Sequence, residues 1–250
     1  EWVASRIQTY GPEDIGYKDV LKAIALGVEW PKDTYVMTWA GRRGHVCLLE
    51  PLVKSGLDID ETDPGDNGYT ALTWMASRGN LEGVREALRL KASPVPKETC
   101  KYNIDTPLEA AAGRHHADIV DMLISAGAPL TVGKMNGPST VIGRAMAANT
   151  FNEKEHARKV KTVEQLLNAG SDPETIVPVS YDGTDEPSKH LSCLELAKNC
   201  GLQPLIDLIS AHVEMKRQFE KLKANGFPVD GTIDSPAGVT FKKVGIKLKP

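Results

Sequence analysis

The chain has 250 residues, of which 41% are apolar and 25% are charged, a balance that is ordinary for a folded protein. The formal net charge is -3, so the composition gives no reason to expect a nucleic acid or an anionic membrane as a partner. No apolar run approaches the roughly 18 residues of a membrane span, and the low aromatic content favours thin helical layers over one large core.

An apolar helical run followed by glycine recurs along the chain. Such runs lead into Gly27, Gly56, Gly127 and Gly170, each within a similar short phrase. A glycine at this point can adopt the left-handed conformation that closes a helix. A further copy carries Lys91 in place of the glycine, so its helix end is predicted to be the least favourable. A phrase repeated at such intervals predicts small helical units stacked on one another.

The first helix of each unit is predicted to begin at a hydroxyl residue. Thr106 can cap the free amides, and the proline after it suits the first helical position. The same frame begins at Thr70 and recurs more weakly at Thr140 and Ser192. The steps from 70 to 106 and from 106 to 140 are 36 and 34 residues, whereas the step from 140 to 192 is 52. The last step must therefore contain insertions.

This order of helix start, turn, second helix and glycine resembles the ankyrin repeat, which has a period of about 33 residues and a Thr-Pro-Leu-His-x-Ala frame. Residues 106–108 keep that frame, with Glu109 in place of the histidine. The turn between the two helices stands as Gly44-His45, Gly79-Asn80 and His115-His116. The resemblance covers about residues 1–212, is strongest in the middle three repeats, and implies an all-α solenoid that binds proteins.

We therefore expect an ankyrin-repeat solenoid of about six helix-turn-helix units with hairpin tips over residues 1–224, followed by a non-repeat extension at 225–250. The extension ends in apolar residues that alternate with lysine or glycine, a spacing that indicates a short strand or a solvated tail. The expected units are a capping unit at 1–31, repeats at about 33–60, 66–95, 101–130 and 136–174, and a capping unit at 190–224.

Two insertions interrupt the later units. Residues 149–161 are rich in charge and are expected to lengthen the helices or the turn between them. Residues 175–189 are rich in proline, aspartate, glycine and serine, which predicts a long loop at a hairpin tip.

The cysteines indicate neither disulfides nor a metal site. Cys47 and Cys100 each stand alone in a repeat, and reduced thiols are typical of an intracellular protein, here expected in the cytoplasm. Cys193 and Cys200 lie near His190, but a zinc site needs a fourth ligand and usually closer pairs. We interpret them as packing thiols and expect no metal and no cofactor.

The residues also give little indication of catalysis. Neither standard glycine-rich phosphate loop nor a nucleophile elbow occurs in the chain. By the resemblance, His45, His115 and His116 are turn residues that bridge the backbones of adjacent loops. Trp39 and Trp74 lie within first helices and are predicted to belong to the core.

Arginine occupies one equivalent position in three successive units, immediately before the turn. These residues are Arg43, Arg78 and Arg114, and Arg42 adds to one end. Stacked helices lie roughly 8–10 Å apart, so the guanidinium groups are predicted to form a column on the concave side. Guanidinium forks suit carboxylates and phosphates, which favours an acidic segment of a partner as the ligand. The alternative is a solvated row of arginines without a partner, neutralised by acids such as Asp105.

The hairpin tips are the second candidate surface, because their residue types are not set by packing. Tyr69 precedes Thr70, and Asp105 holds the equivalent place before Thr106. The full set of predicted partner-binding residues is Arg42, Arg43, Arg78, Arg114, Asn67, Tyr69, Tyr102, Asn103 and Asp105.

The predicted function is recognition of another protein, of unknown identity, by the concave face and the tips. One alternative is an enzyme whose late insertions fold over the concave face. Another is an adaptor fragment whose second domain lies outside these 250 residues. The titratable residues available to the enzyme would be His156, Asp182, Asp185, Glu186 and His190.

Overall fold

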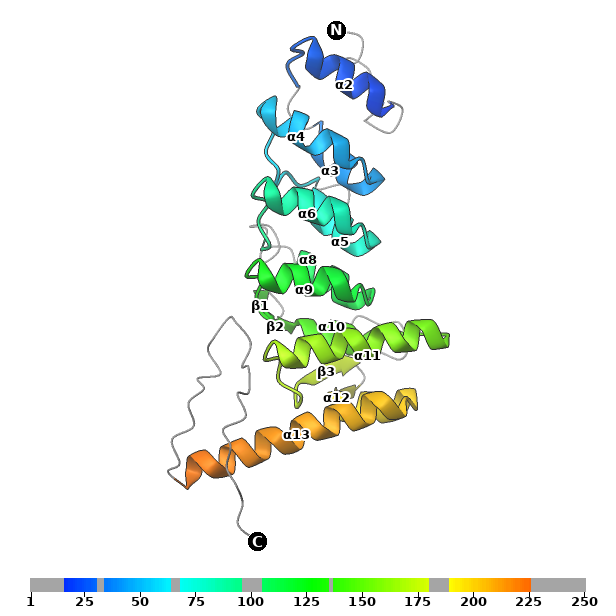
Figure 1. The fold of residues 1–250 in the computed structure, drawn as a ribbon, viewed down its shortest axis with the longest axis vertical. Helices are drawn as coiled ribbons and strands as arrows, with labels where there is room; N and C mark the ends of the chain where they lie inside the picture. The colour runs from blue at the N-terminus through cyan, green and yellow to red at the C-terminus, as the bar shows by residue number, and fades with distance from the viewer. Residues whose placement is uncertain are drawn as a thin grey trace.

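The computed structural model describes residues 16–30, 34–63, 68–95, 105–134, 137–179 and 189–225. Within these ranges eleven helices and four short strands are stacked in layers, from α2 at one end to α13 at the other (Figure 1). The elements are α2 (Tyr17–Ala25), α3 (Val36–Arg43), α4 (Val46–Lys54), α5 (Ala71–Arg78), α6 (Leu81–Arg89), α8 (Pro107–Gly113), α9 (Ala117–Ser125), β1 (Thr131–Lys134), β2 (Gly137–Thr140), α10 (Val141–Ala147), α11 (Glu153–Asn168), β3 (Ile176–Val179), β4 (Lys189–Ser192), α12 (Cys193–Cys200) and α13 (Gln203–Ala224).

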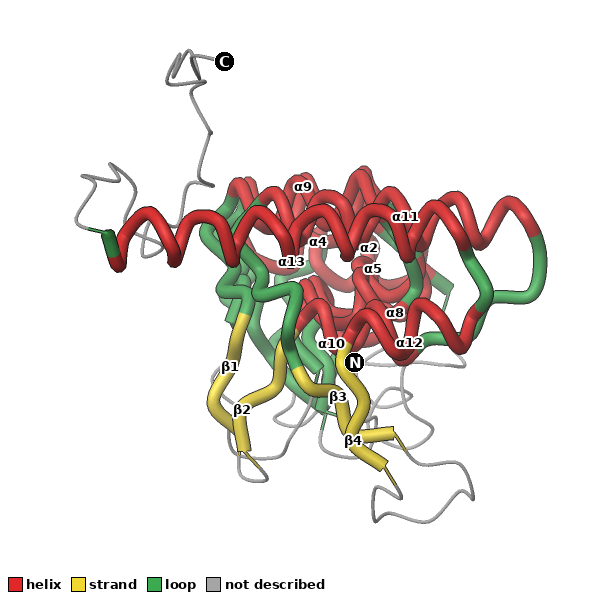
Figure 2. Tube along the Cα trace, turned by 90° about the horizontal axis from the view of Figure 1, so that it is seen from below, coloured by secondary structure: helices red, strands yellow, loops and turns green. Residues whose placement is uncertain are grey.

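The helices form two layers, as the view along the stack shows (Figure 2). The first helices α3, α5, α8, α10 and α12 make the inner layer, and the second helices α4, α6, α9, α11 and α13 make the outer layer. Two antiparallel hairpins, β1–β2 and β3–β4, project from the inner-layer side. Thr131 pairs with Thr140 in the first hairpin, and Ile176 pairs with Ser192 in the second. The predicted all-α repeat solenoid is confirmed.

Small residues allow the inner helices to approach one another closely. A Cβ atom added at Gly41 on α3 would lie 2.4 Å from the Cα atom of Ala71 on α5, so only glycine fits there. Alanines on the inner helices, such as Ala76, Ala111 and Ala145, are fully buried. The core is therefore a continuous stripe between the two layers rather than one central cluster.

Three of the four predicted hydroxyl caps form, at Thr70, Thr106 and Ser192, whereas Thr140 at the start of α10 makes no side-chain capping bond. The Thr106 hydroxyl accepts a hydrogen bond from the Glu109 amide at 3.1 Å, and the Glu109 carboxylate accepts one from the Thr106 amide at 2.7 Å. Ser192 and Glu195 repeat this reciprocal capping box on α12. Glu109 is fully buried, so its place in the family's histidine position is explained by this cap.

The second helices end as the glycine phrase predicts. Gly27, Gly56, Gly127 and Gly170 all have φ between +63° and +100°. Lys91 adopts the same left-handed conformation, with φ of +70°, although it carries a side chain. A lysine in this conformation is strained because its Cβ crowds the following carbonyl oxygen.

Replacing Lys91 with glycine is expected to raise the free energy of unfolding by about 0.5–1 kcal/mol, because the relief of strain exceeds the added entropy of the unfolded chain. Urea denaturation followed by circular dichroism measures the change. Ala126→Gly is the control, since Ala126 is an exposed residue at the end of α9 with φ of -81°. The control is expected to lose stability, and a loss at Lys91→Gly as well would contradict the strain.

The first insertion lengthens a helix. α11 has 16 residues, against nine in α4, α6 and α9. Residues 175–189 were predicted to form a long loop. The structure differs at both ends of this segment, because residues 176–179 and 189–192 form a strand pair. The β-branched residues Ile176 and Val177 favour this extended backbone, and Val177 is buried against the core.

α13 is the longest helix, at 22 residues, and most of its side chains outside the apolar stripe of Leu205, Ile209 and Val213 are exposed. This polar outer face is suited to the end of a stack. None of the described helices combines the length and the apolar character needed to cross a membrane. The predicted first helix of the N-terminal unit and the strand predicted in the extension lie outside the described residues.

Lys159, within the charged insertion, is a buried residue rather than a solvated one. Its ammonium group donates to the carbonyl oxygens of Met146 at 2.9 Å and Ala148 at 2.8 Å, so it satisfies the carboxyl end of α10. Burial lowers the pKa of this amine.

Lys159→Met is expected to lower the free energy of unfolding by about 1–3 kcal/mol, because two buried carbonyl groups lose their donor. Thermal and urea denaturation measure the loss. Lys154→Met on the exposed face of the same helix is the matched control, with little change expected. Equal stability of the two variants would show that the Lys159 amine does not support α10.

Candidate functional site

A cavity of about 660 Å³ lies at the turn end of the central units. The turns join a first helix to the second helix of the same unit, whereas the hairpins join successive units, so the cavity and the hairpins lie at opposite ends of the helices. Its lining comes from α5, α8, α11 and the segments that follow α8 and precede α11. The lining residues are Trp74, Ser77, Arg78, Gly113, Arg114, His115, His116, Asn149, Thr150, Phe151, Glu155 and Arg158.

Two of the predicted arginines meet at this cavity. Arg78 and Arg114 both line it and are both exposed. Arg42 and Arg43 end α3, one unit earlier, and do not line it. A third arginine, Arg158 on α11, joins the pair from the outer layer. The sequence frame did not find Arg158 because it lies in an insertion, where no equivalent position exists in the other units.

Trp74 is different from its prediction as a core residue. The indole is only partly buried and lines the cavity. The guanidinium carbon of Arg78 lies 5.5 Å from the centre of this ring, and Tyr69 contacts the ring edge-on with 5.1 Å between centroids. The Trp74 ring therefore contacts both Arg78 and Tyr69. Trp39, by contrast, is buried as predicted, 5.1 Å from the ring of His45.

Tyr69 and Asp105, predicted at successive hairpin tips, lie close to each other. The pKa of Tyr69 is raised, first by burial and then by the negative charge of Asp105. Asp105 accepts a hydrogen bond from the Arg144 guanidinium at 2.5 Å, so its charge is engaged at the hairpin end of the helices. Arg144 stands four residues after Thr140, and Trp74 stands at the equivalent position, four residues after Thr70. Comparison of that position along the chain would have found it.

His116 makes the bridge that the resemblance implies for the turn histidines. Its Nε2 atom lies 3.1 Å from the Ser77 carbonyl oxygen in the preceding unit. The pKa of His116 is lowered, chiefly by burial, and the charges of Arg158 and Arg114 lower it further. All three residues line the same cavity.

His115 occupies a turn position that is glycine in the two preceding units. It has φ of +56°, close to the +73° and +75° of Gly44 and Gly79. The side chain is 5% exposed, and within the described part of the chain neither ring nitrogen makes a hydrogen bond of good geometry, although the Ala112 carbonyl lies near enough to the imidazole to affect its pKa. Burial lowers the pKa of His115 to about 4, and the positive charges of Lys159 and His116 add to this effect. Glu155 and the Ala112 carbonyl oppose it.

Stability is therefore expected to depend on pH through His115. The folded pKa of about 4 lies below the usual 6.5, so the unfolded chain binds the extra proton between these values. The free energy of unfolding falls as the pH drops from 6.5 through 4, by up to roughly 3 kcal/mol. Urea denaturation at steps of pH measures it, with His115→Gly as the comparison. The same slope in both proteins over this window would contradict the assignment.

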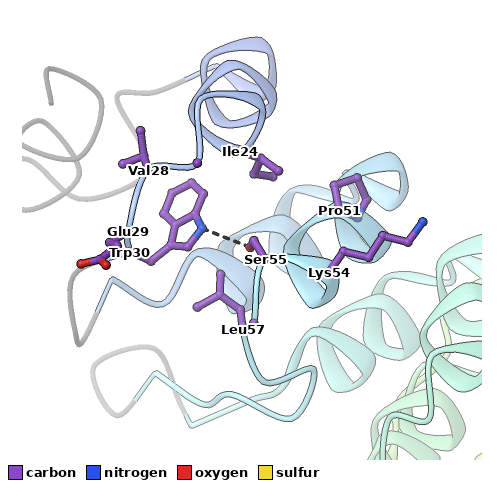
Figure 3. Close-up of a pocket in the computed structure, with 10 residues that line it drawn as sticks. Ile24, Val28, Glu29, Trp30, Pro51, Lys54, Ser55 and Leu57 are labelled. Carbon is purple, nitrogen blue, oxygen red and sulfur yellow. Dashed lines mark hydrogen bonds between the residues drawn. The ribbon is translucent and has the colours of Figure 1, made fainter.

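A second cavity, of about 690 Å³, lies between the end of α2 and the end of α4 (Figure 3). The Trp30 indole enters it and donates a hydrogen bond to the Ser55 hydroxyl at 3.2 Å. Its charged lining residues are Glu29 and Lys54, of opposite sign. This cavity therefore lacks the concentration of like charge found at the turn end.

The other predicted site residues are not brought together in the described chain. Asn67, Tyr102 and Asn103 lie outside the described residues, as do Asp182, Asp185, Glu186 and Cys100. His156 contacts the Thr150 carbonyl oxygen at 3.3 Å, and His190 is exposed on β4.

The described cysteines Cys47, Cys193 and Cys200 are free thiols. Over the described residues, no group of three or more histidine, cysteine, aspartate or glutamate side chains has an arrangement that could hold a metal ion.

Helix pairs that stack only on their neighbours are the architecture of a helical repeat protein. Residues 37–133 match the family model for ankyrin repeats, in three copies, so this part of the chain consists of ankyrin repeats and the resemblance is confirmed. No curated protein matches the chain. Ankyrin repeats are generally modules for protein–protein interaction and are typically not enzymes.

Proposed function

We propose that this chain recognises another protein through its concave face and hairpin tips, and that the ligand is an acidic segment of the partner. One observation carries the proposal: Arg78 and Arg114, aligned by the repeat register, line the same cavity, where Arg158 joins them. A guanidinium group offers five donors in a planar fork that matches a carboxylate. Three such groups favour a negatively charged ligand over a neutral one.

Apolar side chains next to the arginines supply the other component of a protein interface. Phe151 is 85% exposed at the rim of the cavity, and Trp74 presents its ring beside Arg78. Interfaces are enriched in aromatic residues and arginine relative to other surfaces. A helical repeat also presents these groups on a preformed scaffold, which limits the entropy lost on binding.

The tips extend this surface toward the hairpin end. Tyr69 and Asp105 are adjacent there, and the partner-binding roles of Asn67, Tyr102 and Asn103 remain part of the proposal. Arg42 and Arg43 would extend the arginine column by one unit. The free thiols of the described cysteines support an intracellular setting.

The enzyme alternative would need a carboxylate available to a histidine at a cavity. Glu155 is the acidic residue beside His115 and His116, but its carboxylate accepts hydrogen bonds from the Phe151 amide at 2.8 Å and the Asn152 side chain at 2.9 Å. These bonds give it a capping role at the start of α11. The interaction hypothesis therefore accounts for more of the cavity.

The double reversal Arg78→Glu with Arg114→Glu is expected to abolish selection of acidic ligands, because two positive charges at the cavity become negative and its net charge falls by four units. Peptide display on the immobilised protein measures this. The wild type is expected to enrich peptides that are rich in Asp and Glu with neighbouring apolar residues. The helical melting curve should be nearly unchanged, since both arginines are exposed.

Lys22→Glu with Arg85→Glu is the matched control for the total charge. Both residues are exposed on α2 and α6, away from the cavity, and the double change alters the net charge equally. The control should still enrich acidic peptides. Enrichment of the same peptides by the Arg78 and Arg114 variant would remove the arginines from the binding surface.

A further inference from the structure

The turn-end cavity carries more positive charge than a single carboxylate would neutralise. Arg78, Arg114 and Arg158 supply three guanidinium groups, and among the described residues that line the cavity Glu155 supplies one carboxylate. That carboxylate is already held at the start of α11 by the Phe151 amide. Two positive charges therefore remain for a ligand.

The three arginines come from three different places in the fold. Arg78 ends α5, Arg114 follows α8, and Arg158 lies on the lengthened part of α11. The ring of Trp74 lies beneath the Arg78 guanidinium, which limits the positions that this long side chain can adopt. Arginines from three elements that line one cavity can offer several guanidinium forks to one compact anion.

His115 adds a polar group that the turn itself does not need. Glycine would satisfy the left-handed backbone at this position without strain, as Gly44 and Gly79 do. The imidazole is instead buried in the cavity wall, and no described residue makes a hydrogen bond of good geometry with its ring nitrogens. A neutral imidazole offers one donor and one acceptor. Such a departure from the locally favoured residue is typical of a functional position.

We propose that this cavity is a subsite for a phosphorylated serine or threonine within the partner's acidic segment, an inference that rests on the proposed function. A phosphate monoester carries about -1.5 to -2 charges at pH 7 and presents three strong acceptor oxygens. It therefore matches the two remaining positive charges and the three guanidinium forks. Because both nitrogens of His115 are covered, a rotation of its ring is needed to bring an N–H group to a phosphate oxygen.

The neighbouring aromatic residues favour a particular type of residue next to the phosphorylated one in the partner. Phe151 is exposed and lines the cavity, as does Trp74 on the inner-layer helix α5. An apolar residue adjacent to the phosphorylated one would bury its side chain against these rings. The subsite is thus specific for a phosphate on a peptide chain rather than for a free anion.

Three peptide libraries test the subsite. They share degenerate flanks of Asp, Glu and apolar residues and are different only at the central position, which is phosphoserine, glutamate or serine. Retention of each library on the immobilised full chain is measured. The phosphoserine library is expected to be retained about tenfold more strongly than the glutamate library. Inorganic phosphate, added as a competitor, should displace it only weakly.

Two variants separate the subsite from the wider acidic surface. Arg158→Ala should abolish the preference for phosphoserine over glutamate and weaken retention of the glutamate library to a smaller extent, whereas Lys154→Ala, one turn earlier on α11, should behave as wild type. His115→Gly should lower phosphoserine retention severalfold although it relieves a strained backbone.

Equal retention of phosphoserine and glutamate by the wild type would overturn the subsite and leave the proposed function intact. A preference for phosphoserine that survives Arg158→Ala would also overturn it. Retention of none of the three libraries would overturn the subsite and the acidic-segment proposal together.

Discussion

Each helix pair in this chain is too thin to bury its own apolar face, so its fold depends on the pair stacked against it. The contact is close because small side chains line it, as at Gly41, where a single added Cβ would collide with the backbone of Ala71. The same contact fixes the register between neighbouring units. The alignment of equivalent surface residues follows from that fixed register, since residues at one position of the frame lie one above another.

The candidate site shows how this constraint assembles function from distant parts of the chain. Arg78 and Arg114 are 36 positions apart in sequence, yet the stacking of α5 on α8 brings both to one cavity. The first helices all have seven or eight residues, and hydroxyl caps begin α5, α8 and α12. Where the frame changes, at His115 and at the lengthened α11, the surface changes as well.

The sequence predicted the repeats well because their signals are local. A capping threonine acts within one turn of helix, and the left-handed conformation at Lys91 was expected from its place in the phrase. The burial of Lys159 was not predicted, because it depends on carbonyl groups of a different helix. Arg158 was missed because an insertion has no register to compare. The strands at 176–179 and 189–192 were hidden by a composition typical of loops.

The length of α11 bears on the register in which an extended partner segment could bind. A surface built from equal repeats looks alike after a shift of one unit, so an extended ligand could bind in several frames of similar energy. α11 has 16 residues where its counterparts in three other units have nine, and at 1.5 Å per residue it extends about 10 Å further at the turn end (Figure 1). Among the described second helices α4, α6, α9 and α11, this overhang occurs at α11 alone. The overhang breaks the translational symmetry of the repeat surface. A partner segment that contacts it can therefore bind in one register and one direction.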